Sequence, residues 1–186
     1  MPKKAKPLFW VDLEMTGLDE KVDSILEAAV IISDVDFNVL EEYATVVFQP
    51  DAVLEQMNDW CKKAHKKSGL TCEVPKGKPL KKVEEELLAL LEKHYKKGAR
   101  VVLIGNSVGN DRRFIDKYMP KLAARLHYRI LDVSSFKELF REKYGIEYKK
   151  KNGHRALGDI KESMEELKYY LQYVQISAAK GKNVKE

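Results

Sequence analysis

Five side chains that could bind a metal ion or accept a proton are spread along this 186-residue chain: Asp12, Glu14, Asp111, His154 and Asp159. The first two lie in the apolar run Leu8–Met15, which is predicted to form a buried strand. Side chains alternate along a strand, so Asp12 and Glu14 are expected on one face, with Cα atoms about 7 Å apart. Two acids on an otherwise apolar strand repel each other and are costly to remove from water. A divalent cation between them is the simplest compensation.

Asp111 is predicted to lie at the start of a helix that follows a central strand. Ile115 and Tyr118 stand at positions i+4 and i+7 from it, so Asp111 should share their inward face. Asp116 falls outside this stripe and is expected in solvent. Ligands of α/β folds tend to bind at the carboxyl ends of central strands, which makes Asp111 a candidate metal ligand. The alternative is a first-turn acid that complements the helix dipole.

His154 and Asp159 lie just before and just inside the last predicted helix. A neutral imidazole beside an activated water can serve as a general base near pH 7. Asp159 could instead be a second dipole acid, and a lone histidine is often structural. Together with the other acids, however, the pattern supplies four hard oxygen ligands, which suit Mg²⁺ or Mn²⁺ better than Zn²⁺.

This set of residues fits two-metal hydrolysis of a phosphodiester, in which two divalent cations about 4 Å apart hold the scissile phosphate. Asp12 would bridge both ions. Glu14 and Asp159 would support one ion, and Asp111 would lie in the outer sphere of the other. His154 would take the proton of the attacking water.

The elements that must position these residues alternate between strands and helices. Strands are predicted over 8–15, 27–35, 39–48, 101–104 and 130–131, with a hairpin joining the second and third. Helices are predicted over 52–68, 80–97, 110–118, 133–144 and 156–176, with Asp132 capping the fourth. Strands first, then alternating helices and strands, indicate a mixed α/β sheet with helices on its faces.

The length fits one domain with a sizeable core, expected over residues 7–176, between basic, flexible tails at 1–6 and 177–186. No apolar run approaches the roughly 18 residues that span a bilayer, and no apolar segment follows the first residues as in a signal peptide. We therefore expect a cytoplasmic protein without a membrane partner. Cys61 and Cys72 form no CxxC pair and are expected to be reduced.

The formal net charge of +5 comes from the two ends of the chain. Its sources are Lys3, Lys4 and Lys6 at one end, and Lys180, Lys182 and Lys185 against Glu186 at the other. Residues 7–176 are therefore close to neutral. Proteins that grip long duplexes usually carry a basic surface, because neutralising phosphates supplies most of their affinity. This distribution argues against such a protein.

Three segments resemble, in order and in spacing, the three motifs of the DEDDh exonucleases. They are Trp10–Leu18 (WVDLEMTGL), Gly105–Phe114 (GNSVGNDRRF) and His154–Ile160 (HRALGDI). Within that group the chain closely resembles the oligoribonuclease family from Trp10 to about Tyr173. Further matches are Asp59–Trp60, His65, Ser68–Leu70 and His127–Ser134.

The resemblance implies a ribonuclease H-like exonuclease fold, a five-stranded mixed sheet flanked by helices. It implies a homodimeric 3′→5′ exoribonuclease that degrades very short RNA, notably dinucleotides, to nucleoside 5′-monophosphates. By matching position, Leu18 would wedge between the two bases, and Trp60 and His65 would line the 3′ side. Ser107, Arg129 and Ser134 would hold the 5′ phosphate, and Tyr128 would come from the second subunit. A substrate with few phosphates also agrees with the near-neutral body of the chain.

Other interpretations remain open from the sequence. Leu18 and Trp60 could be core residues, and Tyr128 an ordinary interface aromatic. The segment Asp12–Thr16 approximates the strand motif of haloacid dehalogenase phosphatases, in which Asp12 would be a nucleophile, although Glu14 replaces the usual second aspartate. A non-catalytic dinucleotide-binding module and a DNA-proofreading exonuclease are two further classes.

Overall fold

The structure is a computed structural model that describes residues 5–150 and 154–175. Its centre is a five-stranded sheet with the order β3-β2-β1-β4-β5. The strands are β1 (Leu8–Met15), β2 (Ile25–Ser33), β3 (Val39–Val46), β4 (Val101–Gly105) and β5 (Leu126–Asp132). The first three pair antiparallel, whereas β4 runs parallel to β1 and β5 runs parallel to β4. The predicted mixed sheet and the predicted β2–β3 hairpin are confirmed.

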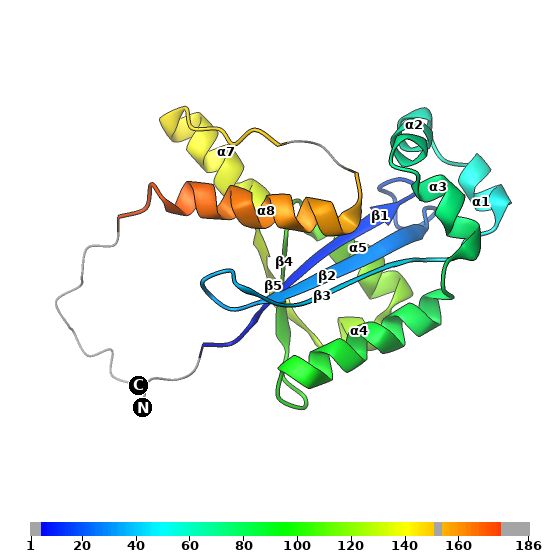
Figure 1. The fold of residues 1–186 in the computed structure, drawn as a ribbon, viewed down its shortest axis with the longest axis horizontal. Helices are drawn as coiled ribbons and strands as arrows, with labels where there is room; N and C mark the ends of the chain where they lie inside the picture. Colours follow the sequence, from blue (N-terminus) through cyan, green and yellow to red (C-terminus); the bar gives the residue numbers. More distant parts are fainter. Residues whose placement is uncertain (1–4, 151–153, 176–186) are drawn as a thin grey trace.

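Helices cover both faces of this sheet (Figure 1). They are α1 (Asp51–Glu55), α2 (Asp59–Lys67), α3 (Leu70–Glu73), the 3-10 turn η1 (Val74–Lys76), α4 (Leu80–His94), α5 (Gly109–Tyr118), α6 (Pro120–Ala123), α7 (Val133–Tyr144) and α8 (Ala156–Leu171). The core cluster on one face joins the sheet to α4 and α5, and the cluster on the other joins it to α7 and α8. A smaller cluster lies among α1, α2 and α3.

The alternation of β1 decides which face carries the acids. Phe9, Val11 and Leu13 belong to the core cluster under α4 and α5. Trp10 belongs to the cluster under α8. Because side chains alternate along the strand, Asp12 and Glu14 share the face of Trp10 and point toward α8.

Several element boundaries differ from those predicted. The helix expected over 52–68 is broken between α1 and α2, where the Asn58 side chain accepts a hydrogen bond from the Cys61 amide at 2.8 Å and begins a new helix. The helix expected over 80–97 ends at His94, and the following residue is extended. The last helix ends at Leu171 rather than at residue 176, which lies outside the described residues.

The strand expected over 130–131 extends over 126–132 in the structure. It was predicted too short because β5 lies at the edge of the sheet. Tyr128, Arg129 and Ile130 are exposed, so this strand lacks the apolar run that marks a buried one. The prediction that Asp132 caps the following helix is confirmed, since its side chain accepts a hydrogen bond from the Ser134 amide at 3.0 Å.

Most of the predicted tails lie outside the described residues, so the 7–176 domain boundary and the flexibility of both ends stay predictions. Within the described ranges, no helix is long and apolar enough to cross a membrane.

Candidate active site

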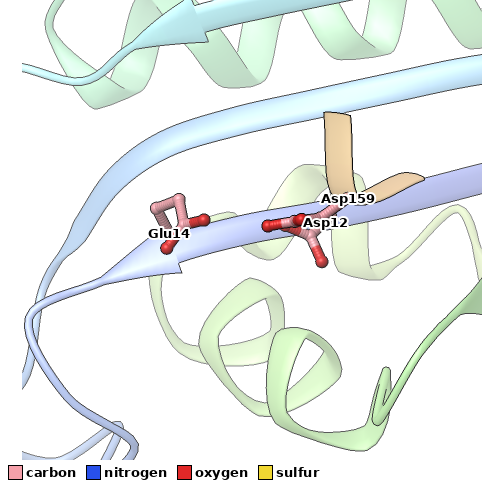
Figure 2. Close-up of side chains that lie close together, drawn as sticks. All are labelled: Asp12, Glu14 and Asp159. Carbon is pink, nitrogen blue, oxygen red and sulfur yellow. The ribbon is translucent and has the colours of Figure 1, made fainter. Parts of the chain in front are cut away.

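Three carboxylates meet where β1 faces the start of α8. Asp12, Glu14 and Asp159 each offer an oxygen, and these oxygens lie within 4.8 Å of one another. Figure 2 shows Asp12 and Glu14 on the same strand, with Asp159 reaching the same place from α8. β1 and α8 are far apart in the sequence, and they meet because α8 packs on this face of the sheet. The cluster offers a cation oxygen ligands from two elements.

Burial makes these acids hard to ionise together. It raises the pKa of Asp12 well above its usual value, and the neighbouring acids Asp111 and Glu14 raise it further. The pKa of Glu14 is raised to about 8, mainly by burial and then by Asp159. Burial also raises the pKa of Asp159. A divalent cation would remove this penalty by making the ionised forms the stable ones.

Asp111 lies beside the cluster but outside it. As predicted, it is on the inward face of α5 with Ile115, whereas Asp116 is exposed. Its Oδ1 accepts a hydrogen bond from the Leu13 amide at 2.8 Å, which joins the start of α5 to the strand between Asp12 and Glu14. Burial raises the pKa of Asp111 to about 7, and that hydrogen bond opposes the rise. One of its oxygens is therefore engaged by the backbone of β1.

Gly105 allows this close approach between β4 and β1. A Cβ atom at Gly105 would lie 2.6 Å from the carbonyl oxygen of Val11, closer than side chains tolerate. The glycine in the second motif therefore has a packing function, since its missing side chain lets the end of β4 lie against the strand that carries Asp12.

His154 stands at the rim of the cluster, next to Trp60. The two rings meet edge to face with their centroids 5.5 Å apart. Burial raises the pKa of Asp159, and the neighbouring His154 opposes that rise. His154 has φ of 48°, an unusual backbone conformation for a residue other than glycine, which surrounding contacts must maintain.

Leu18, Trp60 and His65 are brought together in one pocket of about 390 Å³. Its lining consists of Leu13, Glu14, Met15, Gly17, Leu18, Asn58, Trp60, Cys61 and His65. Leu18 is 62% exposed and Trp60 is 65% exposed, so the alternative that they are core residues is wrong. The pocket opens beside Glu14 and therefore connects the apolar side chains to the acidic cluster.

His65 forms the inner wall of this pocket. It is 1% exposed, and its Nε2 lies 2.9 Å from the carbonyl oxygen of Met15. Its Nδ1 lies 3.8 Å from a carboxylate oxygen of Glu14. Burial lowers the pKa of His65, so the ring is neutral at physiological pH, with Nε2 donating to Met15.

Ser107 and Ser134 are also brought together, by Asp132. The Oδ1 atom of Asp132 accepts hydrogen bonds from the Ser107 amide at 2.9 Å and from the Ser134 hydroxyl at 2.6 Å. Arg129 lies on the same edge strand, with its guanidinium 5.2 Å from the ring centre of Tyr128. The Tyr128 side chain is 71% exposed, and its ring stacks on His127 with the ring centroids 4.5 Å apart.

Two residues near the cluster were missed by the sequence reasoning. Glu27 of β2 is 3% exposed and lies opposite Glu14 in the strand register. Arg155 binds it, with Nη2 2.8 Å from Oε1. An acid inside the apolar run of β2 was the available signal, and it is the same signal that singled out Asp12 and Glu14.

The exonuclease family model (RNase T) matches residues 9–167 of this chain. A protein of Dictyostelium discoideum named probable oligoribonuclease is 50% identical over 172 residues, covering 90% of each chain. The mitochondrial oligoribonuclease of Homo sapiens is 48% identical, covering 89% of this chain and 72% of its own. The oligoribonuclease of Haemophilus influenzae is 44% identical over 178 residues, covering 93% of this chain and 97% of its own.

Solved structures share the fold at much lower identity. The zinc-bound complex of E. coli exonuclease I with single-stranded DNA has a TM-score of 0.67 and 14% identity over 88% of this chain. Exonuclease I without ligand gives the same TM-score, with 13% identity. This chain spans about 40% of the length of those proteins. The likeness shows a ribonuclease H-like exonuclease fold, as predicted.

Proposed function

We propose that this chain, which belongs to the exonuclease family together with the oligoribonucleases, is a 3′→5′ exoribonuclease that converts very short RNA to nucleoside 5′-monophosphates. Family membership makes it a hydrolytic nuclease, and diribonucleotides are the substrate we favour. The observation that carries the proposal is the acidic cluster of Asp12, Glu14 and Asp159 beside a pocket with exposed Leu18 and Trp60. A dehalogenase-type phosphatase is no longer a competing assignment, because the family is different.

The acidic cluster and the family indicate dependence on a divalent metal. We propose two ions, Mg²⁺ or Mn²⁺, held by Asp12, Glu14 and Asp159, with Asp111 in the outer sphere. The donor set fits them, since every donor is a carboxylate oxygen and burial alone leaves these acids reluctant to ionise. When bound, such ions stabilise charge on the phosphate and lower the pKa of water.

His154 is proposed to accept the proton of the attacking water at an imidazole nitrogen. Its place at the rim, against Trp60 and within electrostatic reach of Asp159, supports this assignment. A histidine is suited to the step because its usual pKa lies near neutrality.

The pocket is proposed to hold the 3′ nucleotide. Leu18 would wedge between the two bases, and Trp60 and His65 would line the 3′ side. A volume of about 390 Å³ falls within the range of small-ligand sites rather than of channels for long strands. Exposed apolar side chains beside a catalytic cluster are also what base stacking requires.

The opposite end of the substrate is proposed to meet Ser107, Arg129 and Ser134, which would hold the 5′ phosphate and exclude longer RNA. The hydrogen bonds of Asp132 that join the two serines support this grouping. Tyr128 is proposed to act on the site of a second subunit in a homodimer. Its exposure on the edge strand β5 supports this, because an exposed edge is a ready surface for association.

The compartment stays a prediction. The sequence favours the cytoplasm, and among the relatives the human and bovine proteins are named mitochondrial.

The substrate class is tested by comparing turnover of a 5′-phosphorylated diribonucleotide, a heptaribonucleotide and single-stranded DNA with Mn²⁺ or Mg²⁺. We expect the diribonucleotide to be cleaved fastest and the DNA slowest. Equal or faster cleavage of DNA would favour a DNA exonuclease, and tight binding of the dinucleotide without cleavage would favour a binding module.

A further inference from the structure

The guanidinium of Arg155 lies between two carboxylates from different parts of the chain. Its Nε and Nη2 atoms lie 3.0 and 2.8 Å from Oε1 of Glu27 on β2. Its Nη1 and Nη2 atoms lie 2.9 and 3.0 Å from the two oxygens of Glu73 at the end of α3. The planar fork of arginine suits such paired bonds, whereas the point charge of lysine does not.

Glu27 links this arrangement to the metal strand. Its side chain is 4% exposed, and it lies opposite Glu14 where β1 and β2 pair. Its second oxygen accepts a hydrogen bond from the Ala156 amide at 2.9 Å, so it also engages the first residue of α8. Removing the arginine would leave this buried carboxylate with the Ala156 amide but without its positively charged partner.

The backbone of Arg155 joins the two candidate site residues on either side. Its carbonyl oxygen accepts a hydrogen bond from the Asp159 amide at 3.0 Å. His154 precedes it directly, with the positive φ of 48° that needs support from its surroundings. The position of both side chains therefore depends on where residue 155 is held.

We infer that Arg155 is a positioning residue, which acts through Glu27 and Glu73 to hold His154 and Asp159 against β1. This inference rests on the proposed function, in which those two residues are the general base and a metal ligand. Glu27 fixes the start of α8 relative to the strand of Asp12 and Glu14. Glu73 binds the guanidinium from α3, the helix that follows α2 in the chain. We call Arg155 together with Glu27 and Glu73 the clamp. These ion pairs fix the position of residue 155 and, through it, the positions of His154 and Asp159.

The kinetic test uses Arg155→Met, which removes the charge with little change in volume, and Arg155→Lys, which keeps the charge and loses the fork. We expect Arg155→Met to lower kcat for a diribonucleotide roughly 100-fold, because small displacements of catalytic groups have effects of this size. KM should change by less than about three-fold, since Arg155 does not itself line the pocket. Arg155→Lys should recover only part of kcat. Arg141→Met is the matched control, because Arg141 forms an ion pair with Glu138 on the exposed side of α7.

A double-mutant cycle with His154→Ala separates positioning from simple stabilisation. If Arg155 acts partly through His154, the double variant should be slowed by less than the product of the two single effects, and the remaining effect of Arg155→Met is the part that acts through Asp159. If the fold-decrease in kcat of the double variant equals the product of the two single fold-decreases, Arg155 does not act through His154 and the inference is overturned for that residue.

Tryptophan fluorescence, measured without metal and without substrate, tests the position of His154 independently of the reaction. Trp60 contacts His154, whereas the chain's other tryptophan, the fully buried Trp10, packs under α8. The same Arg155 substitution in a Trp60→Phe protein therefore measures the Trp10 contribution, which is subtracted. Removing His154 should change the Trp60 emission, and Arg155→Met should change it in the same direction.

A folded Arg155→Met protein with wild-type emission and wild-type kcat would overturn the inference and leave the proposed function standing. If Arg155→Met does not fold, the same two readouts on Arg155→Lys decide. A wild-type protein that cleaves no diribonucleotide would overturn the proposed function, while the emission test would still report on the clamp.

Discussion

Glu14 and Glu27 lie opposite each other on the antiparallel strands β1 and β2, yet the structure neutralises only one of them with an arginine. Glu27 is bonded to Arg155 and to the backbone of α8. Glu14 lies 3.8 Å from the neutral His65, and burial raises its pKa to about 8. Glu27, which is buried, therefore has an internal cation, and Glu14, which is half-buried, is the one that we propose binds an external cation.

The first prediction concerns pH and the stability of the metal-free protein. Folding raises the pKa of Glu14 from 4.5 to about 8, so between these values the folded state keeps a proton that the unfolded chain has released. This contribution to stability is complete below pH 4.5 and is lost as the pH rises through about 8. The free energy of unfolding should fall with pH in this window, by at most about 1.4 kcal/mol per pH unit for each such group. Melting curves in EDTA across the pH series measure it.

Added Mn²⁺ should reverse this trend, because it binds the deprotonated carboxylates, and the rise in Tm on adding metal should grow with pH. Glu14→Gln is the control, since it removes the titrating group and should make the metal-free protein more stable at pH 8 than wild type. A flat pH dependence in EDTA would contradict the prediction.

The second prediction concerns the Leu18 side chain. Leu18→Ala should raise KM for a diribonucleotide about 10-fold, since burying a leucine against the bases is worth roughly 1.5–3 kcal/mol and 1.4 kcal/mol is tenfold. Stability should change little, because the side chain is 62% exposed in the free protein. Val22→Ala is the matched control, an exposed apolar residue of the same β1–β2 connection. Equal effects of the two substitutions would exclude a specific wedge.

The third prediction concerns the contact between β4 and β1. Gly105→Ala should lower both Tm and activity, because the new methyl group would meet the Val11 carbonyl at 2.6 Å and displace the strand that carries Asp12. Overpacking of this kind costs about 1–3 kcal/mol. Gly158→Ala is the comparison for stability, since nothing lies within 4 Å of a Cβ atom there and alanine favours helix. Thermal melts of both variants measure the difference, and equal Tm values would refute it.

The fourth prediction concerns the second subunit. If Tyr128 acts in trans, a mixture of His154→Ala and Tyr128→Ala proteins should regain activity that neither has alone. Random exchange into heterodimers gives about a quarter of the wild-type activity, because half the dimers carry one intact site. Sedimentation of each variant checks that dimers persist. A stable, fully active wild-type monomer would remove Tyr128 from the site.

The sequence predicted the elements whose apolar pattern is strong. β1 and β4 are apolar runs that are mostly buried, although Val102 is exposed, and α5 carries Asp111 on its inward stripe, so their positions followed from the apolar pattern. β5 was predicted too short, because an edge strand exposes residues such as Tyr128 and has no buried pattern to detect. The break before α2 was missed because the cap at Asn58 interrupts a segment that is helix-prone throughout.

Asp12 and Glu14 could be predicted because acids are anomalous in an apolar strand. Asp111 and Asp159 are ordinary first-turn acids taken singly, and only the combined pattern singled them out. The clamp could not be predicted, because Arg155 and Glu27 are 128 residues apart and only the folded chain shows that they meet. The pairing of Ser107 with Ser134 through Asp132 is likewise a product of the β4–β5 register. The spacing of residues in the sequence identifies candidate metal ligands, whereas the contacts that hold those ligands in place are seen only in the folded structure.

The most direct test is turnover of a 5′-phosphorylated diribonucleotide by the wild type, by Asp12→Ala and by Asp116→Ala, with Mn²⁺ or Mg²⁺ and then with EDTA. Asp116 is the matched control, an exposed acid on α5 that pairs with Arg112. We expect nucleoside 5′-monophosphates from the wild type and from Asp116→Ala only when metal is present, and none from Asp12→Ala. Full activity of Asp12→Ala, or undiminished wild-type turnover in EDTA, would contradict metal-dependent hydrolysis at this cluster.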